Sequence, residues 1–356
     1  MKTIAANCNV YSSADLVADI EELLSGYTQK QVFLMADEGS MASCYSLIAG
    51  VSKFSEEHTI IIPQGDDNKN VQTAVRIWEF LSANGATRKS ILVNLGGGMP
   101  CDLGGFCAAT FKRGIDFINI PTTILAQVDA SLGGKTGMNL GCLKNEIGVF
   151  SKAKAVVING MFLKSLDHRN LLSGFAEMLK HALIHDAGSL ARLMGLDFDH
   201  PDYSKIQEAV CESICVKNYF VTEDPTEKGV RKALNFGHTF GHAFETFSMR
   251  HNEHPILHGY AVAYGMVCEL MLSEMKLGLS HEAAKPVCDY INRQYGKYEF
   301  AETDFAELLE LMTHEKKNGA DGINFTLLPR LGEISINNIG SPDEITAVLN
   351  KYLNSK

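Results

Sequence analysis

Histidines gather in one short part of the chain. Five of the twelve histidines lie between His238 and His258. In the stretch NFGHTFGHAFET, His238 and His242 are four residues apart, so they share one face if the stretch is helical. Catalytic zinc is typically bound by imidazoles and one carboxylate, with one coordination position left open for water or substrate. Surface or capping histidines are the alternative, and the spacing leaves it open.

Other charged side chains could take part in a metal site or bind an anion. In GFAEMLKHALIHD, Glu177 and Lys180 are three residues apart and again fall on one helical face. The net charge of -10 argues against a general nucleic-acid binder, so any anion site must be local. The cations that could form such a site are Arg113, Lys135, Lys144, Lys217, Arg231, Lys316 and Lys317.

A glycine-rich stretch, GGGMPCDLGGF at residues 96–106, follows an apolar run at residues 91–93. Glycines after a strand let backbone N–H groups approach a pyrophosphate closely. The stretch does not match G-x-G-x-x-G, so a phosphate loop and a tight turn both remain open. Residues 111–150 combine glycines with charged and polar residues and predict a loop folded around a charged small molecule, with a solvated connector as the alternative.

The elements that must position these residues fall into two kinds. A chain of 356 residues exceeds the usual size of one hydrophobic core, which indicates two domains. Up to residue 158, short strand-like runs alternate with helical patterns, which predicts a parallel sheet covered on both faces. These runs are 31–35, 59–63, 90–95, 117–120 and 155–158.

Helical periodicity predominates in the second half of the chain. The predicted helices are 171–185, 206–220, 233–247, 261–277 and 305–312, and only 322–328 and 333–337 have an extended pattern. The sequence therefore predicts an α/β fold, with a parallel-sheet domain at 1–162 and a mostly α-helical domain at 163–356.

Cysteine usage and the N-terminus indicate the compartment. The nine cysteines are scattered without a C-x-x-C pair, which favours a reducing cytoplasm over a disulfide framework. The N-terminus turns acidic before any signal-like apolar run, and no later run approaches membrane-spanning length. The expected location is cytoplasmic.

Seven ordered motifs, from residue 96 to residue 328, resemble those of the 3-dehydroquinate synthase family. They are GGGMPCDLGGFCAATFKRG, PTTILAQVDASLGGKTG, KNEIGVF, GFAEMLKHALI, RKALNFGHTFGHAFE, LHGYAVAYGM and EKKNGADGINFTLL. The resemblance implies a Rossmann-like NAD-binding first domain, a helical second domain holding Zn²⁺ or Co²⁺, and a homodimer. It also implies the second step of the shikimate pathway, in which 3-deoxy-D-arabino-heptulosonate 7-phosphate becomes 3-dehydroquinate and phosphate.

The resemblance also implies roles for individual residues. The implied metal ligands are Glu177, His238 and His258. The implied acid/base residues are His242 and Glu227, so that His242 transfers a proton and is not a ligand. The further catalytic residues are Lys135, Lys180, Arg231 and Asn235. The implied substrate contacts are Arg113, Asp129, Lys135, Asn145, Glu177, Lys180, Lys217, Arg231, Asn235, Lys316 and Lys317. The implied NAD contacts are Asp37, Asp66, Lys69, Gly97, Gly98, Asp102, Thr122, Thr123, Lys144, Phe162 and Ser165. Arg113 is expected to reach the active site of the neighbouring subunit.

Some motifs depart from the family pattern. Proteins with other functions also share some of the family's features. Tyr260 stands where a glutamate is usual beside His258, and Asp66 stands where a longer glutamate is usual. A related sugar phosphate cyclase would use the same NAD and metal but needs no group for a substrate carboxylate. The sequence also leaves open a metal- and NAD-dependent polyol dehydrogenase, which shares a GGG-x-x-x-D loop, and an inactive scaffold.

Overall fold

A computed structural model describes residues 1–141, 143–313 and 322–355, which divide into two compact units. The first contains Met1–Asp167 and Asp202–Asn218, and the second contains His168–Pro201 and the described residues from Tyr219 onward. The boundary after residue 162, expected to separate an NAD-binding domain from a metal-binding domain, stays a prediction. Residues 202–218, the first part of a long helix, belong to the unit that holds the sheet.

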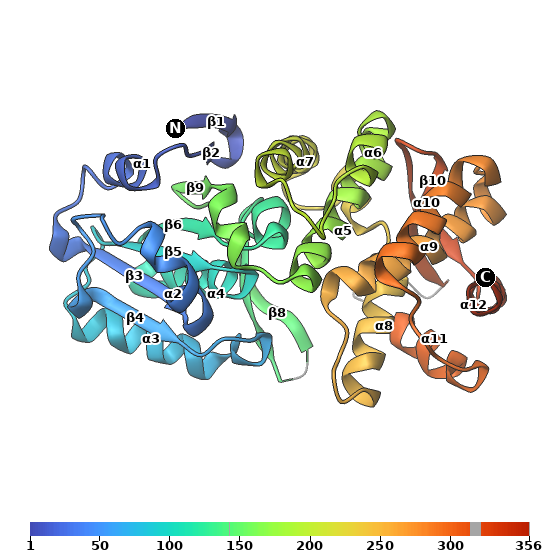
Figure 1. The fold of residues 1–356 in the computed structure, drawn as a ribbon. Helices are drawn as coiled ribbons and strands as arrows, with labels where there is room; N and C mark the ends of the chain where they lie inside the picture. Colours follow the sequence, from blue (N-terminus) through green and yellow to red (C-terminus); the bar gives the residue numbers. More distant parts are fainter. Residues whose placement is uncertain (142, 314–321, 356) are drawn as a thin grey trace. The chain divides into compact units, whose positions relative to one another are not determined.

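The first unit is built on a seven-stranded sheet in the order β1-β2-β9-β6-β5-β3-β4 (Figure 1). The strands are β1 (Lys2–Ala5), β2 (Val10–Ser12), β3 (Val32–Asp37), β4 (Thr59–Ile62), β5 (Ile91–Gly96), β6 (Asp116–Pro121) and β9 (Ala155–Ile158). All neighbours pair in parallel except β1 and β2, which pair antiparallel at one edge. The predicted α/β fold with a parallel sheet is therefore confirmed, and the edge pair β1–β2 was not foreseen.

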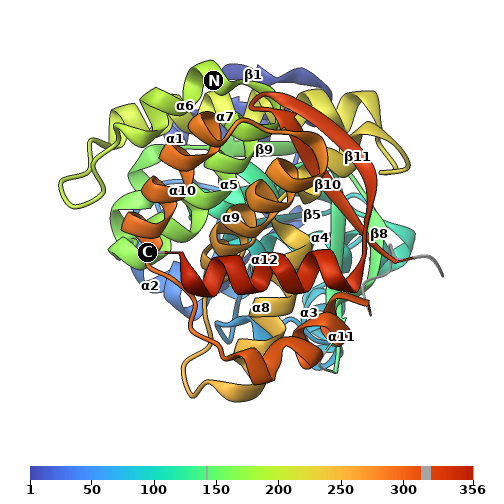
Figure 2. The same ribbon diagram turned by 90° about the vertical axis from the view of Figure 1, so that its right-hand side faces the viewer.

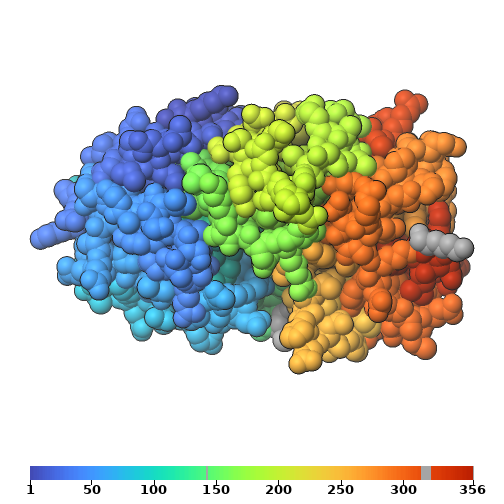
Figure 3. Space-filling view, in the orientation of Figure 1, coloured from blue at the N-terminus to red at the C-terminus, as the bar shows by residue number. Residues whose placement is uncertain are grey.

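Helices cover both faces of this sheet, which explains why its central strands are continuously apolar. All six residues of β5 are buried. On one face Val93 and Leu95 pack with Ile20 and Leu24 at α1 (Leu16–Leu23). The other face is covered by α3 (Val71–Ala83) and α4 (Gly98–Thr110). In the space-filling view (Figure 3), the blue N-terminal segments form much of the visible surface of this unit.

Residues 135–141 and 143–150, expected to form part of a loop, instead contribute two antiparallel strands. The strands are β7 (Lys135–Leu140) and β8 (Leu143–Phe150). Gly137 lies opposite Gly148, and a Cβ on Gly148 would fall 2.4 Å from the carbonyl oxygen of Thr136. The close approach of the two strands therefore needs glycine. The sequence prediction was wrong because glycines and polar residues on both strands mask the alternation that identifies a strand.

The second unit consists mainly of helices and one hairpin. The helices are α5 (His168–His185), α6 (Ala187–Met194), α8 (His238–His251), α9 (His258–Leu277), α10 (His281–Tyr295), α11 (Phe305–Thr313) and α12 (Pro342–Asn354), while α7 (Tyr203–Glu223) begins in the first unit and ends in this one. Strands β10 (Ile323–Arg330) and β11 (Glu333–Gly340) lie at the two segments with an extended pattern, and they pair antiparallel. Figure 2 shows α12 lying across this unit, and α12 packs on α9.

One predicted helix of the second unit is interrupted. The pattern at 233–247 predicted a single helix, but a 3-10 turn at Val230–Asn235 ends before α8 begins at His238. Gly237 separates the two with a φ of 80°, which glycine adopts without strain. Among the described helices, none combines the length and apolar character needed to cross a membrane.

Candidate functional site

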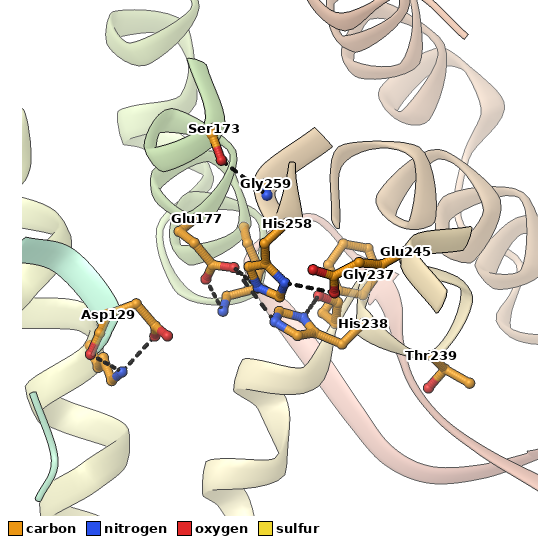
Figure 4. A network of polar contacts seen from close by, with 12 residues as sticks. Asp129, Ser173, Glu177, Gly237, His238, Thr239, Glu245, His258 and Gly259 are labelled. Atoms are coloured by element: carbon orange, nitrogen blue, oxygen red, sulfur yellow. Dashed lines mark hydrogen bonds and ion pairs between the residues drawn. The ribbon is translucent and has the colours of Figure 1, made fainter. Parts of the chain in front are cut away.

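Three side chains from three helices converge in the second unit. Glu177 projects from α5, His238 begins α8 and His258 begins α9 (Figure 4). One carboxylate oxygen of Glu177, Oε1, lies 3.5 Å from Nε2 of His238 and 3.7 Å from Nε2 of His258. The predicted pair Glu177 and Lys180 lies on one face of α5, and the Lys180 ammonium contacts the other oxygen of Glu177.

Hydrogen bonds at the far side of each imidazole fix which nitrogen faces Glu177. Nδ1 of His238 lies 3.1 Å from the carbonyl oxygen of Phe236, and Nδ1 of His258 lies 3.2 Å from a carboxylate oxygen of Glu245. Both partners are acceptors, so Nδ1 carries the proton in each ring. Nε2 of each ring is therefore the nitrogen that faces Glu177 and that a cation would bind. Glu245 was not singled out from the sequence, although it lies seven residues after His238 on the same face of α8.

The charges around this cluster favour an ionised carboxylate. Burial works against ionisation of Glu177, but Lys180, His258 and His238 hold its pKa well below the usual range. Burial, together with the nearby Lys180, holds the pKa of His238 well below its usual value, so this imidazole is neutral. Burial opposes the charge on His258, but Glu245 and Glu177 raise its pKa to about 10. A cation that binds here therefore displaces a proton from His258.

The donor set fits a divalent metal ion. Oε1 of Glu177 is buried and has no hydrogen-bond partner among the described residues, which is costly unless another group supplies positive charge. Once His258 has given up its extra proton, two imidazole nitrogens and one carboxylate oxygen match the three protein ligands of catalytic zinc sites. His242 also lies nearby, with its ring centroid 5.2 Å from that of His238. It belongs to a second group with Glu245 and His258, in which Nδ1 of His258 already bonds Glu245.

A close backbone approach holds α5 and α9 together beside the cluster. Gly259 directly follows His258, and its N–H donates to Oγ of Ser173 over 3.2 Å. A Cβ on Gly259 would lie 1.8 Å from the carbonyl oxygen of Ser173, so only glycine allows the contact. Because Ser173 precedes Glu177 by one helical turn, this contact sets the separation of Glu177 and His258.

A Gly259→Ala variant is expected to be destabilised by roughly 1–3 kcal/mol or more, because α5 and α9 must move apart to admit the methyl group. Urea unfolding of the metal-free protein measures the change. Gly26→Ala is the matched control, since nothing lies within 4 Å of a Cβ placed there. Equal stability of the two variants would show that the Ser173 contact is not tight.

A loop of the second unit carries three more of the predicted residues. Asn235 donates to a carboxylate oxygen of Glu227 over 3.0 Å. Arg231 is 2% exposed, and its guanidinium donates to the carbonyl of Pro225 over 2.8 Å. The Asp224 side chain, not foreseen from the sequence, accepts the backbone N–H groups of residues 228, 229 and 231. These bonds hold Glu227, which has a φ of 59°, and Arg231 in one ordered turn.

In the first unit, the glycine stretch lies where a sheet strand meets a helix. Strand β5 ends at Gly96. Gly97 is the N-cap residue of α4, but it has no side chain that could accept hydrogen bonds from the first N–H groups of the helix. The N–H of Thr122, at the end of the adjacent strand β6, donates to the Gly96 carbonyl over 2.9 Å. Uncapped N–H groups at the carboxyl ends of parallel strands suit an anionic group such as a pyrophosphate.

A cluster of polar side chains in the first unit brings together several of the residues predicted to bind NAD or substrate. The Lys69 ammonium lies 2.6 Å from the Asp102 carboxylate and also contacts the Asn145 side chain. Lys144 lies 3.4 Å from Asp66. Asn139, which the sequence prediction missed, accepts the Asn145 N–H over 2.9 Å and donates to the Asp66 carbonyl over 3.1 Å.

The remaining predicted residues of the first unit lie in varied surroundings. The buried Lys217 donates to the Asp129 carbonyl over 2.6 Å and pairs with its carboxylate. The side chain of Phe162 is fully buried in the core of the unit, and Oγ of Ser165 donates to the Phe162 carbonyl. The other four are Asp37, which caps α2 (Glu38–Cys44), Thr123, which accepts the Ala126 N–H, and the exposed Arg113 and Lys135. Lys316 and Lys317 lie outside the described residues.

Comparison with known proteins identifies the family. Two sequence-family models match, one described as 3-dehydroquinate synthase N-terminal over residues 59–173 and one as 3-dehydroquinate synthase C-terminal over residues 174–318. A 3-dehydroquinate synthase from Parabacteroides distasonis is 46% identical over 96% of both chains. Another, from Lactococcus lactis subsp. cremoris, is 35% identical over 91% of both chains.

Solved structures of two other synthases share the fold at lower identity. A 2-deoxy-scyllo-inosose synthase in complex with carbaglucose-6-phosphate, NAD⁺ and Co²⁺ has a TM-score of 0.84 at 21% identity, over 96% of both chains. A 2-epi-5-epi-valiolone synthase from Streptomyces hygroscopicus with NAD⁺ and Zn²⁺ bound has a TM-score of 0.80 at 21% identity, over 99% of this chain and 98% of that one. From the matches along its length, the chain belongs to the 3-dehydroquinate synthase family.

Proposed function

We propose that this chain is a 3-dehydroquinate synthase, which converts 3-deoxy-D-arabino-heptulosonate 7-phosphate to 3-dehydroquinate and phosphate. The observation that carries the proposal is the convergence of Glu177, His238 and His258 beside Lys180, in a chain 46% identical to such an enzyme over nearly its full length. The reaction is an oxidation, an elimination of phosphate, a reduction and an aldol closure, with no net redox change.

The proposed cofactors are NAD⁺ and Zn²⁺ or Co²⁺, which the related structures contain. When bound, NAD⁺ would take a hydride from the substrate and return it, while the cation would stabilise negative charge on the reacting oxygen. Glu177, His238 and His258 would hold the cation. The residues proposed to hold NAD⁺ are Asp37, Asp66, Lys69, Gly97, Gly98, Asp102, Thr122, Thr123, Lys144, Phe162 and Ser165. For Phe162, whose side chain is buried, only the main chain is proposed to make contact.

The residues around the cation would bind and orient the substrate and move its protons. His242 lies beside His238 but groups with Glu245 and His258, whereas Glu177 groups with His238 and His258, which suits a proton-transfer residue better than a ligand. Glu227, held by Asn235, is proposed as a second acid or base. Lys180 and Arg231 would offer charge-assisted hydrogen bonds to anionic groups of the substrate.

The substrate contacts proposed from the family resemblance include residues beyond this cluster. They are Arg113, Asp129, Lys135, Asn145, Glu177, Lys180, Lys217, Arg231, Asn235, Lys316 and Lys317. A substrate with both a carboxylate and a phosphate needs more cationic partners than a sugar phosphate without a carboxylate does. This number of cations therefore favours the heptulosonate phosphate.

Phosphate release from the heptulosonate phosphate tests the proposal. The purified protein with NAD⁺ and Zn²⁺ is expected to release phosphate without accumulating NADH, to stop after chelation and to recover with Zn²⁺ or Co²⁺. Absence of phosphate release by the metal-loaded protein would refute the proposed function.

Two competing functions give different results in the same assay. Another sugar phosphate cyclase would release phosphate from a hexose or heptulose phosphate that lacks the carboxylate. A polyol dehydrogenase would accumulate NADH in proportion to polyol consumed. Structures of dehydrogenases share the fold at lower similarity, including a probable glycerol dehydrogenase from Sinorhizobium meliloti with a TM-score of 0.59 at 13% identity.

A homodimer in which Arg113 reaches the neighbouring active site is part of the proposal. Arg113 is exposed, so its side chain is accessible to another subunit. An Arg113→Ala variant mixed with a Glu177→Gln variant is expected to regain about a quarter of the wild-type activity, because one site of each mixed dimer is intact in both residues. Native mass spectrometry and phosphate release measure assembly and recovery. No recovery in confirmed mixed dimers would mean that Arg113 serves its own subunit.

The proposed location is the cytoplasm. The eight described cysteines are free thiols, as a reducing compartment favours. Detection of phosphate-releasing activity in the cytosolic fraction tests this location.

A further inference from the structure

A buried carboxylate outside the predicted site holds the start of α8. Glu269 lies on α9 and is 0% exposed. Its oxygens accept the Gly237 N–H over 2.7 Å and the Thr239 N–H over 3.1 Å. Gly237 is the N-cap of α8 and offers no side chain of its own, so a neighbouring helix supplies the cap. A carboxylate at this end is also favoured by the helix dipole.

The two bonds lie on either side of a proposed metal ligand. His238 is the residue between Gly237 and Thr239, and its Nδ1 bonds the carbonyl of Phe236 just before the cap. Holding the flanking N–H groups therefore fixes the backbone from which the imidazole of His238 projects. No part of this arrangement depends on a contact between Glu269 and the cation itself.

Glu269 and the other histidine ligand occupy one helix. Glu269 follows His258 by eleven residues, which is close to three helical turns, so both lie on one face of α9 about 16 Å apart along its axis. One stretch of α9 therefore provides His258 and also holds the backbone of His238. The spacing of the two histidines is set within a single pair of helices, α8 and α9.

Glycines let these two helices meet closely enough for the bonds to form. A Cβ on Gly265 would lie 1.9 Å from the carbonyl oxygen of Gly237, and a Cβ on Gly241 would lie 3.0 Å from the carbonyl of Ala261. The glycine contacts fix the separation of α8 and α9. The Glu269 bonds fix how far α8 extends along α9 and how its first turn is rotated.

We propose that Glu269 is a positioning residue for metal binding, which holds His238 in its ligand geometry before the ion arrives. The inference rests on the proposed metal centre and extends it by a residue that no sequence motif singled out. An ordinary structural cap would contribute to stability alone, whereas a positioning residue also contributes to metal affinity.

The affinity of the metal-free protein for Zn²⁺ and Co²⁺, measured by competition with a chelating dye, tests the proposal. Glu269→Gln keeps the shape but offers one acceptor oxygen where two N–H groups need one each. Its affinity is expected to fall about 10- to 100-fold, with an altered Co²⁺ absorption spectrum. Glu269→Asp keeps the charge on a shorter side chain and is expected to lie between the wild type and Glu269→Gln.

Asp186→Ala is the matched control for a lost cap. Asp186 caps α6 by accepting the Gly188 N–H over 3.0 Å, and α6 carries none of the proposed ligands. This variant is expected to lose stability and keep wild-type metal affinity. Wild-type affinity in a folded Glu269→Gln or Glu269→Asp protein would overturn the positioning role. Failure of the wild type to bind either ion would instead refute the proposed metal centre.

Discussion

A Glu177→Gln variant is expected to lose its bound metal and all measurable phosphate release. The amide cannot supply the negative charge of the third ligand, and it leaves the buried Lys180 ammonium without its counter-charge. Removing one partner of a buried ion pair costs about 3–5 kcal/mol, part of which a local rearrangement of Lys180 offsets. Metal content after gel filtration and phosphate release measure the two losses.

Glu282→Gln provides the control for this experiment. Glu282 is an exposed carboxylate in the first turn of α10 and lies in the same unit. Its replacement is expected to leave metal content and phosphate release within about twofold of the wild type, since exposed charges contribute little. Full metal occupancy in Glu177→Gln would contradict the assignment of Glu177 as a ligand.

A His242→Gln variant is expected to retain its metal while phosphate release slows by about 100- to 10,000-fold, the usual contribution of a general acid or base. The reason lies in the geometry, because Glu177 groups with His238 and His258, whereas His242 groups with Glu245 and His258. His238→Gln, four residues earlier on the same helix, is the comparison and is expected to lose metal.

The two histidine variants decide whether His242 is a metal ligand or a proton-transfer residue, which its spacing from His238 alone does not. Metal loss in both variants would make His242 a ligand. Metal retention with wild-type phosphate release in His242→Gln would remove His242 from the proposed proton transfers.

Long, strongly periodic elements could be predicted from the sequence, whereas close contacts between elements could not. The apolar strands of the sheet and helix α3 were predicted because burial imposes a regular spacing. The break between the 3-10 turn and α8 was missed, because it depends on how Gly237 meets Gly265 of α9. That contact joins residues almost thirty positions apart, and no local pattern records it.

In the candidate site too, pairs within one helix could be predicted, whereas groupings between helices could not. Spacing alone paired His238 with His242 and Glu177 with Lys180, since one helical turn relates each pair. The grouping of Glu177, His238 and His258 requires three helices to meet, so only the family resemblance supplied it. Glu245 and Glu269 were missed because a lone buried glutamate has no sequence signature until its partner helix is known.

The contact between Lys180 and one oxygen of Glu177 gives the metal-free protein an internal counterion. Because the chain can neutralise its own ligand carboxylate, we expect it to fold without the ion, unlike small zinc domains that are unfolded without metal. Folding and metal acquisition would then be separate events, and the ion that occupies the centre would depend on the cell's pool of available metals at the time of loading.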